Sequence, residues 1–177
     1  DGVVNVLTDF FSRSDTTLTK VTLNECDIGS AEDALFAAFH TYRTVTDLAI
    51  RKFYSLRGTT VDGNSVSGLL QNMPQLQRLE CSECILGVEG VRAFQPALQA
   101  NRTLRELKLS NCQIGDDGIR LIADALVGNT TMEVLDIGWN DITSNGLDDV
   151  TRVLQSTRLK KIDLGYNRGI FYDEAST

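Results

Sequence analysis

The sequence predicts a right-handed α/β solenoid in which every repeat contributes one short strand and one helix. Three observations predict this fold. One pattern recurs six times, with starts at residues 18, 45, 76, 104, 132 and 159. The spacings between successive starts are 27, 31, 28, 28 and 27 residues, which is too regular to arise by chance. Within each copy the apolar residues first alternate, as in a strand, and then recur every three or four residues, as in a helix.

The strand part of each copy has apolar residues at its first, fourth and sixth positions and Cys or Asn at its ninth. One clear copy consists of Leu104, Leu107, Leu109 and Cys112. The alternation gives each strand one inward face. We therefore expect strands near 20–24, 47–51, 78–82, 106–110, 134–138 and 161–165.

The rest of each copy has helical spacing. Ile119, Ile122, Ala123 and Leu126 show it most clearly, and segments 91–98 and 147–154 repeat it. Polar tags at 101–104 and 129–132 end two of these helices. A single repeat cannot bury its apolar stripe alone, so neighbouring repeats must stack. The strands then form a parallel sheet on the concave side, and the helices cover the convex side.

A period near 28, a full helix and Cys or Asn at the ninth position resemble the ribonuclease-inhibitor-like class of leucine-rich repeats. The resemblance covers about residues 15–170 and implies a horseshoe segment. Two features depart from it. The copy that starts at Val45 has Phe53 at the ninth position, and it is 31 residues long, with residues 57–64 predicted to be an inserted loop.

The repeats predict one leucine-rich-repeat domain over residues 1–177. Residues 3–11 carry an amphipathic helical pattern, so segment 1–17 is expected to be the helical end of a preceding repeat or an N-terminal cap. The last strand is followed by 13 residues, too few for a complete helix and closing tag, and no obvious polar cap is present.

Composition excludes several classes of function. The chain has 177 residues, a net charge of −7 and a pI near 4.7. An acidic chain lacks the basic surface that nucleic-acid binding needs. No apolar run reaches the roughly 20 residues that span a bilayer, so no membrane insertion is expected. No signal-peptide pattern is present at the N-terminus.

The four cysteines are Cys26, Cys81, Cys84 and Cys112. Cys81 and Cys84 form a C-x-x-C, a spacing found in redox sites and in half of a zinc site. The repeat explains both as inward thiols, and no second C-x-x-C exists to complete four zinc ligands. We therefore expect free buried thiols, no metal and no cofactor. Free thiols favour the cytoplasm or another reducing intracellular compartment.

Several polar residues could carry chemistry but also fit the repeat. Asn101 and Asn129 match the glycosylation sequon, but the repeat favours a structural role for them, because asparagine tolerates a left-handed conformation at the end of a helix. Asn140 and Asn167 are expected to satisfy backbone groups. The acidic pairs 116–117 and 148–149 are expected at helix starts, where negative charge is favourable. His40 is the single histidine, so no Ser/His/Asp or Cys/His set is available, and no catalytic residues are predicted.

Stacking aligns the outward strand residues of successive repeats into columns. The column at the strand exit contains Glu25, Lys52, Glu83, Asn111, Trp139 and Tyr166. The two rings become neighbours over Gly138 and Gly165, and they either form a binding hot spot or merely cover the edge of the sheet. The sequence thus predicts a protein-binding site towards the C-terminal half of the concave face, composed of Trp139, Tyr166, Asp136, Asp163 and Lys108.

The expected function is a non-catalytic protein–protein interaction module with another protein as its partner. Two alternatives remain open at this point. The first is a GTPase-activating protein of the Ran type or another regulatory protein, although the chain lacks a strongly acidic tail. The second is a structural subunit of a larger assembly.

Overall fold

The computed structural model describes residues 17–25, 27–29, 35, 39, 44–52, 54–55 and 61–167. The strands are β1 (Lys20–Asn24), β2 (Asp27–Gly29), β3 (Asp47–Arg51), β4 (Tyr54–Ser55), β5 (Arg78–Ser82), β6 (Glu106–Lys108), β7 (Val134–Asp136) and β8 (Lys161–Asp163). The helices are α3 (Gly63–Asn72), α4 (Gly87–Ala100), α5 (Gly115–Leu126), the 3-10 turn η1 (Ser144–Gly146) and α6 (Leu147–Ser156).

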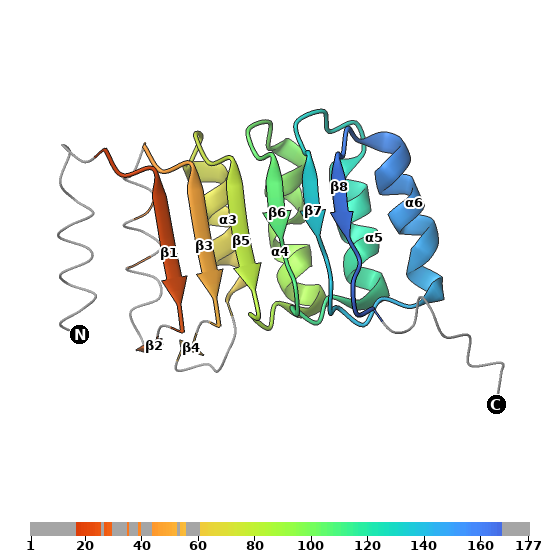
Figure 1. Ribbon diagram of the computed structural model, residues 1–177, viewed down its shortest axis with the longest axis horizontal. Coiled ribbons are helices and arrows are strands. Elements are labelled where there is room, and N and C mark those ends of the chain that lie inside the picture. Colours follow the sequence, from red (N-terminus) through yellow and green to blue (C-terminus); the bar gives the residue numbers. More distant parts are fainter. Residues whose placement is uncertain are drawn as a thin grey trace.

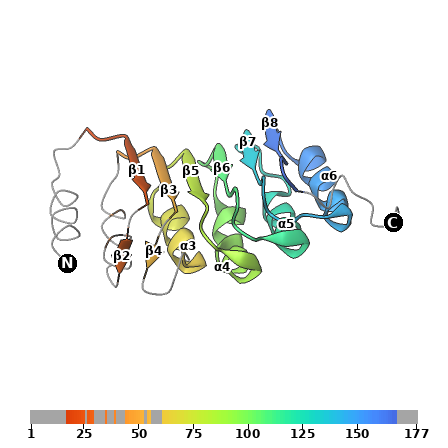
Figure 2. The same cartoon turned by 60° about the horizontal axis from the view of Figure 1, so that its bottom comes forward.

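From α3 onwards, helix and strand alternate along the described chain as predicted. A six-stranded parallel sheet has the order β1-β3-β5-β6-β7-β8, which is also the order along the chain. Strands β2 and β4 form a separate parallel pair. Helices α3 to α6 lie side by side over one face of the large sheet and leave its other face uncovered (Figures 1 and 2). The architecture is an α/β solenoid.

The core lies between the sheet and the helices. The inward strand residues of the central repeats are fully buried, as Leu107, Leu109, Leu135 and Ile137 show. Helix α5 buries the predicted stripe from Ile119 to Leu126 against them. The alternating and helical spacings of the sequence therefore meet in one continuous core.

In the six-stranded sheet, β1, β3 and β5 have the predicted bounds, but β6, β7 and β8 are shorter than predicted. Strands β6, β7 and β8 each have three residues where five were predicted. Ser110, Gly138 and Gly165 stand at the fifth positions, and such residues favour strands weakly. Backbone pairing nevertheless continues past the strands, because Leu109 N–H donates to the Asp136 carbonyl at 2.8 Å.

The prediction of a loop over 57–64 is wrong at its C-terminal end. Asp62 caps helix α3 by accepting the Asn64 N–H at 3.1 Å, and Gly63 and Asn64 are already helical. Helix α4 passes so close that a Cβ on Gly63 would lie 2.2 Å from the Gly90 carbonyl oxygen. Glycine is therefore required here for helix contact. The rest of the predicted loop, the segment before residue 17, Cys26, Phe53 and the residues after 167 lie outside the described residues.

The described side chains at the ninth position bind the backbone of a neighbouring repeat, as predicted for Asn140 and Asn167. Asn140 is fully buried and donates to the carbonyls of Leu109 and Gly138 at 2.7 and 3.0 Å. Its oxygen accepts the Cys112 N–H at 2.8 Å. Asn167 makes the equivalent bonds one repeat later, and the thiol of Cys112 donates to the Cys81 carbonyl. These side chains replace the pairing that the backbone loses where each strand ends.

Both sequon asparagines have a structural role, but the predicted left-handed conformation is wrong. Asn101 has φ −71° and ψ 137°, which is extended backbone. Its oxygen accepts the N–H groups of Thr103 and Leu104, and its amide nitrogen donates to the Leu70 carbonyl at 3.2 Å. Asn129 repeats this arrangement and donates to the Asn101 carbonyl. Both amides are buried, so neither is accessible to a glycosyl group in the folded chain.

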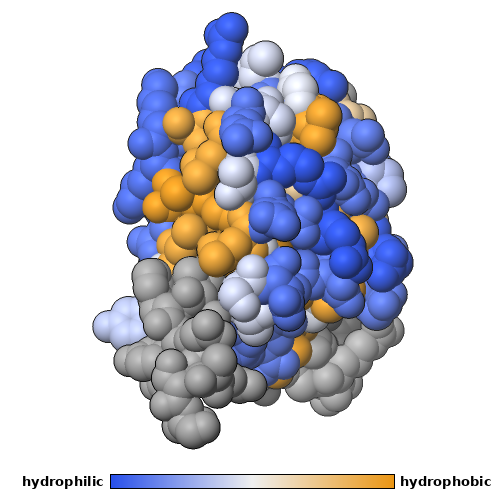
Figure 3. All heavy atoms as spheres, turned by 90° about the vertical axis from the view of Figure 1, so that its right-hand side faces the viewer, coloured by the Kyte–Doolittle hydropathy of each residue, from blue (hydrophilic) through white to orange (hydrophobic). Residues whose placement is uncertain are grey.

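The C-terminal end of the described stack exposes part of the core. Leu159, Ile162 and Leu164 are only partly buried, whereas the matching residues of the two preceding repeats are fully buried. Leu154 on α6 is 48% exposed. Figure 3 views the molecule from this end and shows apolar side chains gathered between hydrophilic ones.

Candidate functional site

The face of the large sheet that no described helix covers, here called the open face, carries the predicted columns. The strand register aligns Glu80, Lys108, Asp136 and Asp163 in one of them, as the repeat predicts. Two hollows lie on this face. The first, the paired depression, is lined by residues of β1, β3, β5 and β6, and the second, the aromatic groove, lies towards β7 and β8.

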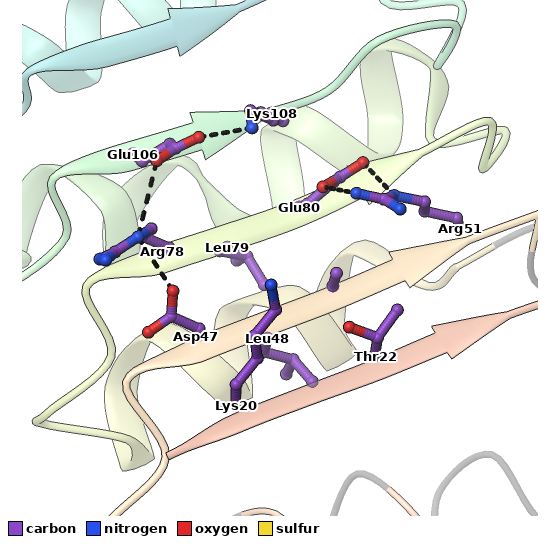
Figure 4. Close-up of a pocket in the computed structure, with 11 residues that line it drawn as sticks. Lys20, Thr22, Asp47, Leu48, Arg51, Arg78, Leu79, Glu80, Glu106 and Lys108 are labelled. Carbon is purple, nitrogen blue, oxygen red and sulfur yellow. Dashed lines mark hydrogen bonds and ion pairs between the residues drawn. The ribbon is translucent and has the colours of Figure 1, made fainter.

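The paired depression has a volume of about 320 Å³ and contains ion pairs that join the strands (Figure 4). Arg78 bridges Asp47 at 2.9 Å and Glu106 at 3.8 Å, and Glu106 also pairs with Lys108 at 2.5 Å. In the same depression Arg51 holds Glu80 through both carboxylate oxygens. Its charges therefore largely satisfy one another across neighbouring repeats.

The pKa shifts in the paired depression have the same origin. Burial raises the pKa of the Glu80 carboxyl, but the hydrogen bonds and positive charge of Arg51 outweigh burial and lower it overall. The hydrogen bond to Glu106 raises the pKa of Lys108, and the charges of Glu106, Glu80 and Asp136 add to this effect. Both side chains are held in their charged forms by partners within the chain.

The aromatic groove is dominated by Trp139 and Tyr166. Their rings stack with centroids 4.0 Å apart and planes 16° apart. Trp139 is nevertheless 49% exposed and Tyr166 is 64% exposed, so both rings stay in contact with solvent. Stacking fixes the orientation of the two rings without burying them.

The backbone explains why these rings are neighbours. Every described residue of the strand-exit column has a left-handed φ between 46° and 58°, including Trp139 at 57° and Tyr166 at 58°. In the column residues from Glu25 to Trp139, the backbone N–H donates to a carbonyl of the next repeat. The bond from Trp139 to Gly165 is 2.8 Å long. The repeat imposes this conformation on non-glycine residues despite a cost of about 1–2 kcal/mol each.

The aromatic groove has a volume of about 580 Å³ and crosses four repeats. It is lined by Glu80, Ser82, Glu83, Ser110, Asn111, Asp136, Gly138, Trp139, Asp163, Gly165 and Tyr166. Four of these residues are acidic and none is basic. Asp136 and Asp163 each accept the N–H of the glycine two residues on, at 3.1 and 2.9 Å. Neither forms an ion pair with any residue that the structure describes.

Gly138 lies at the floor of the groove, beside three acceptor oxygens. A Cβ atom on this residue would lie 3.0 Å from the Gly165 carbonyl oxygen. It would lie 3.5 Å from Oδ1 of Asp136 and 3.7 Å from Oδ1 of Asp163. Gly138 itself is buried, and the Cβ position lies at bonding distance from its Cα, so these distances describe close packing at the groove floor.

The structure brings four of the five predicted site residues together. Trp139, Tyr166, Asp136 and Asp163 line the aromatic groove, whereas Lys108 lines the paired depression and points its ammonium group to Glu106. The other polar lining residues of the groove were not selected from the sequence. They stand in the same columns, but only the described geometry shows that the groove reaches back across β5.

The comparisons with known proteins agree with this geometry. A family model described as Leucine Rich repeat matches residues 100–123 and 128–149. The solved structure titled "Structural Genomics of Caenorhabditis elegans: tropomodulin C-terminal domain" superposes with a TM-score of 0.63 and 14% sequence identity, over 86% of this chain and 90% of that chain. The chain has the leucine-rich-repeat fold. No curated protein sequence gives a significant match. The ribonuclease-inhibitor-like class stays a prediction.

The described cysteines occupy the inward positions that the leucine-rich repeats predict. Cys81 and Cys112 are free thiols, and the three described cysteines, Cys84 included, are fully buried. Burial raises the pKa of Cys81 and of Cys112 well above the ordinary thiol range. A thiol whose pKa is raised by burial is a poor nucleophile, because the reactive form is the thiolate.

Two further searches bear on the site. Within residues 17–25, 44–52 and 61–167 and the shorter described segments, no group of three or more His, Cys, Asp and Glu is arranged to hold a metal ion. No helix in the described part of the chain is both long and apolar enough to cross a membrane.

Proposed function

We propose that this leucine-rich-repeat chain is a non-catalytic protein-interaction module that binds another protein on its open face. The observation that carries the proposal is the exposed stack of Trp139 and Tyr166. Trp and Tyr are enriched among the few residues that dominate binding energy at protein interfaces. The stacked repeats also supply a preformed surface, which lowers the ordering cost of binding.

The alternative role for the rings is to cover the edge of the sheet. The exposure of the rings argues against it, because about half or more of each side chain stays in contact with solvent. The two rings also leave the groove of about 580 Å³ beside them unfilled. Partner binding accounts for both the exposed rings and the groove.

The non-catalytic part of the proposal is supported by the described nucleophiles. Cys81, Cys84 and Cys112 are buried, and the pKa of Cys81 and Cys112 is raised, so these thiols do not suit covalent catalysis. The carboxylates of the paired depression are neutralised by Arg51, Arg78 and Lys108. No observation on the described residues favours the GTPase-activating alternative.

The test is affinity capture with matched variants, read by quantitative mass spectrometry. Wild-type protein is compared with Trp139→Ala, Tyr166→Ala and a control, Val127→Ala, which removes a 58% exposed apolar side chain at the end of α5. Partner proteins should be retained by the wild type and the control and lost from the two ring variants. For the identified partner, Trp139→Ala should weaken binding by about 2 kcal/mol or more, as hot-spot truncations do. Equal retention by all four proteins would refute the proposed surface.

A second candidate, a subunit of a larger assembly, is favoured by the C-terminal end of the described stack. The partly buried Leu159, Ile162 and Leu164 and the exposed Leu154 form an apolar end that another protein surface could cover. Mass photometry of native material tests this candidate, with Leu154→Glu as the interface variant. Assembly that disappears in Leu154→Glu supports it, and a monomer in native material contradicts it.

A further inference from the structure

We infer that the aromatic groove accepts an arginine side chain from a basic segment of the partner protein. The inference rests on the proposed function and specifies the chemistry of the partner at the same site. Two features support it: the charge of the groove, with the acceptor oxygens that carry it, and the stacked rings.

The charge of the groove is one-sided. Glu80, Glu83, Asp136 and Asp163 line it, and no lysine or arginine does. Glu80 is neutralised by Arg51, but Asp136 and Asp163 form no ion pair with a described residue. The paired depression next to it balances its own acids with bases. Unpaired carboxylates on an otherwise paired surface favour a cation supplied by the partner.

Three acceptor oxygens lie close together at the floor of the groove beside Gly138. Two carboxylate oxygens and the Gly165 carbonyl oxygen surround the position that a Cβ on Gly138 would occupy, at 3.0–3.7 Å. The carbonyl already accepts the Trp139 N–H and keeps a second lone pair. Oδ1 of each aspartate accepts one backbone N–H, so both carboxylates are held in place while their second oxygens stay available.

The stacked rings favour arginine over lysine. A cation close to the face of Trp or Tyr is attracted by the ring quadrupole. The guanidinium group is planar, so it can stack on an aromatic face while its N–H fork reaches carboxylate and carbonyl oxygens. An ammonium group is a compact charge that cannot make both contacts with the same geometry. Ser82, Ser110 and Asn111 extend the groove with neutral polar groups that suit the peptide on either side of the arginine.

Trp139 is the only tryptophan of the chain, so intrinsic fluorescence reports on this site alone. The full chain is titrated with the peptide acetyl-Gly-Arg-Arg-Gly-amide and with matched peptides that carry Lys-Lys or Gln-Gln. The arginine peptide should change Trp139 emission saturably, the lysine peptide should bind several-fold more weakly, and the glutamine peptide should have no effect.

The variants test the two carboxylates and the groove floor between them. Asp136→Asn with Asp163→Asn keeps both acceptor oxygens for the glycine N–H groups and removes both charges, and it should weaken arginine-peptide binding about tenfold. Asp148→Asn on α6 is the matched control, because it removes an exposed carboxylate from the helix side and should change nothing. Gly138→Ala places a methyl group among the acceptor oxygens at the groove floor and should reduce binding without altering charge or rings.

The outcomes separate this inference from the proposed function. Equal binding of the arginine and glutamine peptides, or unchanged affinity in the double asparagine variant, overturns the inference. If the arginine peptide fails while Trp139→Ala still loses its protein partner in affinity capture, the open face binds protein by other chemistry and only the inference falls. If the arginine peptide binds but the partner is retained by Trp139→Ala, the proposed surface falls instead.

Discussion

Replacing Asn140 with alanine should destabilise the solenoid strongly, because this carboxamide joins two successive repeats. Its nitrogen donates to the Leu109 carbonyl at 2.7 Å and to the Gly138 carbonyl at 3.0 Å. Its oxygen accepts the Cys112 N–H at 2.8 Å. The side chain is fully buried, so water cannot replace these contacts without entering the core.

The magnitude follows from the number of bonds lost. Leaving a buried partner unsatisfied costs roughly 1–3 kcal/mol, so three good bonds predict a loss of about 4 kcal/mol in the free energy of unfolding. Asn140→Cys should lose only about half as much, because a thiol fills this position at Cys84 and Cys112 and donates to the preceding strand. Urea unfolding, followed by circular dichroism of the helices, measures both losses.

The control is Asn145→Ala. Asn145 is exposed in η1, and its side chain makes no hydrogen bond with another described residue. Its replacement should change the free energy of unfolding by less than about 0.5 kcal/mol. The argument fails if Asn140→Ala and Asn145→Ala unfold at the same urea concentration.

Three further predictions concern packing, the thiols and the rings. Gly63→Ala should destabilise the chain by about 1–3 kcal/mol, since its Cβ would strike the Gly90 backbone. Gly90→Ala should reduce the free energy of unfolding by less, because the added Cβ meets only side-chain atoms of Leu86. Equal urea midpoints for Gly63→Ala and Gly90→Ala would contradict this. Because burial raises the pKa of Cys81 and Cys112, stability should be retained at neutral pH and fall as pH rises above about 8.5, where unfolded thiols ionise; a flat urea midpoint through that range would contradict it. Trp139→Ala should lower stability by no more than about 1.5 kcal/mol, the value of one aromatic stack, in a thermal melt.

The period of the sequence was sufficient to predict the sheet, the helices and the columns. The register of β6, β7 and β8 follows directly from it, since one residue per repeat is aligned. The strand lengths did not follow, because Gly138 and Gly165 stop the regular strand while the backbone pairing continues. The left-handed conformation predicted for Asn101 was wrong because its side chain, rather than its backbone angle, ends the helix.

The sequence predicted only part of the candidate site. A column gives the order of side chains from repeat to repeat, but not which neighbouring side chain each one turns towards. Lys108 and Asp136 are in register, yet Lys108 turns to Glu106 and lies in the paired depression. The described geometry separates paired charges from Asp136 and Asp163, which form no ion pair with a described residue. Contacts between side chains of different columns decide this separation, and no repeat pattern encodes them.

The stacked rings show how the repeat itself can prepare a binding site. Neighbouring parallel strands lie about 4.8 Å apart, which is close to the distance at which aromatic rings stack. Aromatic residues at one column position in adjacent repeats are therefore brought together by the backbone, here by the bond from Trp139 N–H to the Gly165 carbonyl. Because the rings are already ordered at a centroid distance of 4.0 Å, a partner that contacts them does not have to immobilise them. The left-handed conformation that places them is shared by Glu25, Lys52, Glu83 and Asn111, so the fold bears its cost in every described repeat. The proposed site therefore depends on which residues the repeats place in these columns.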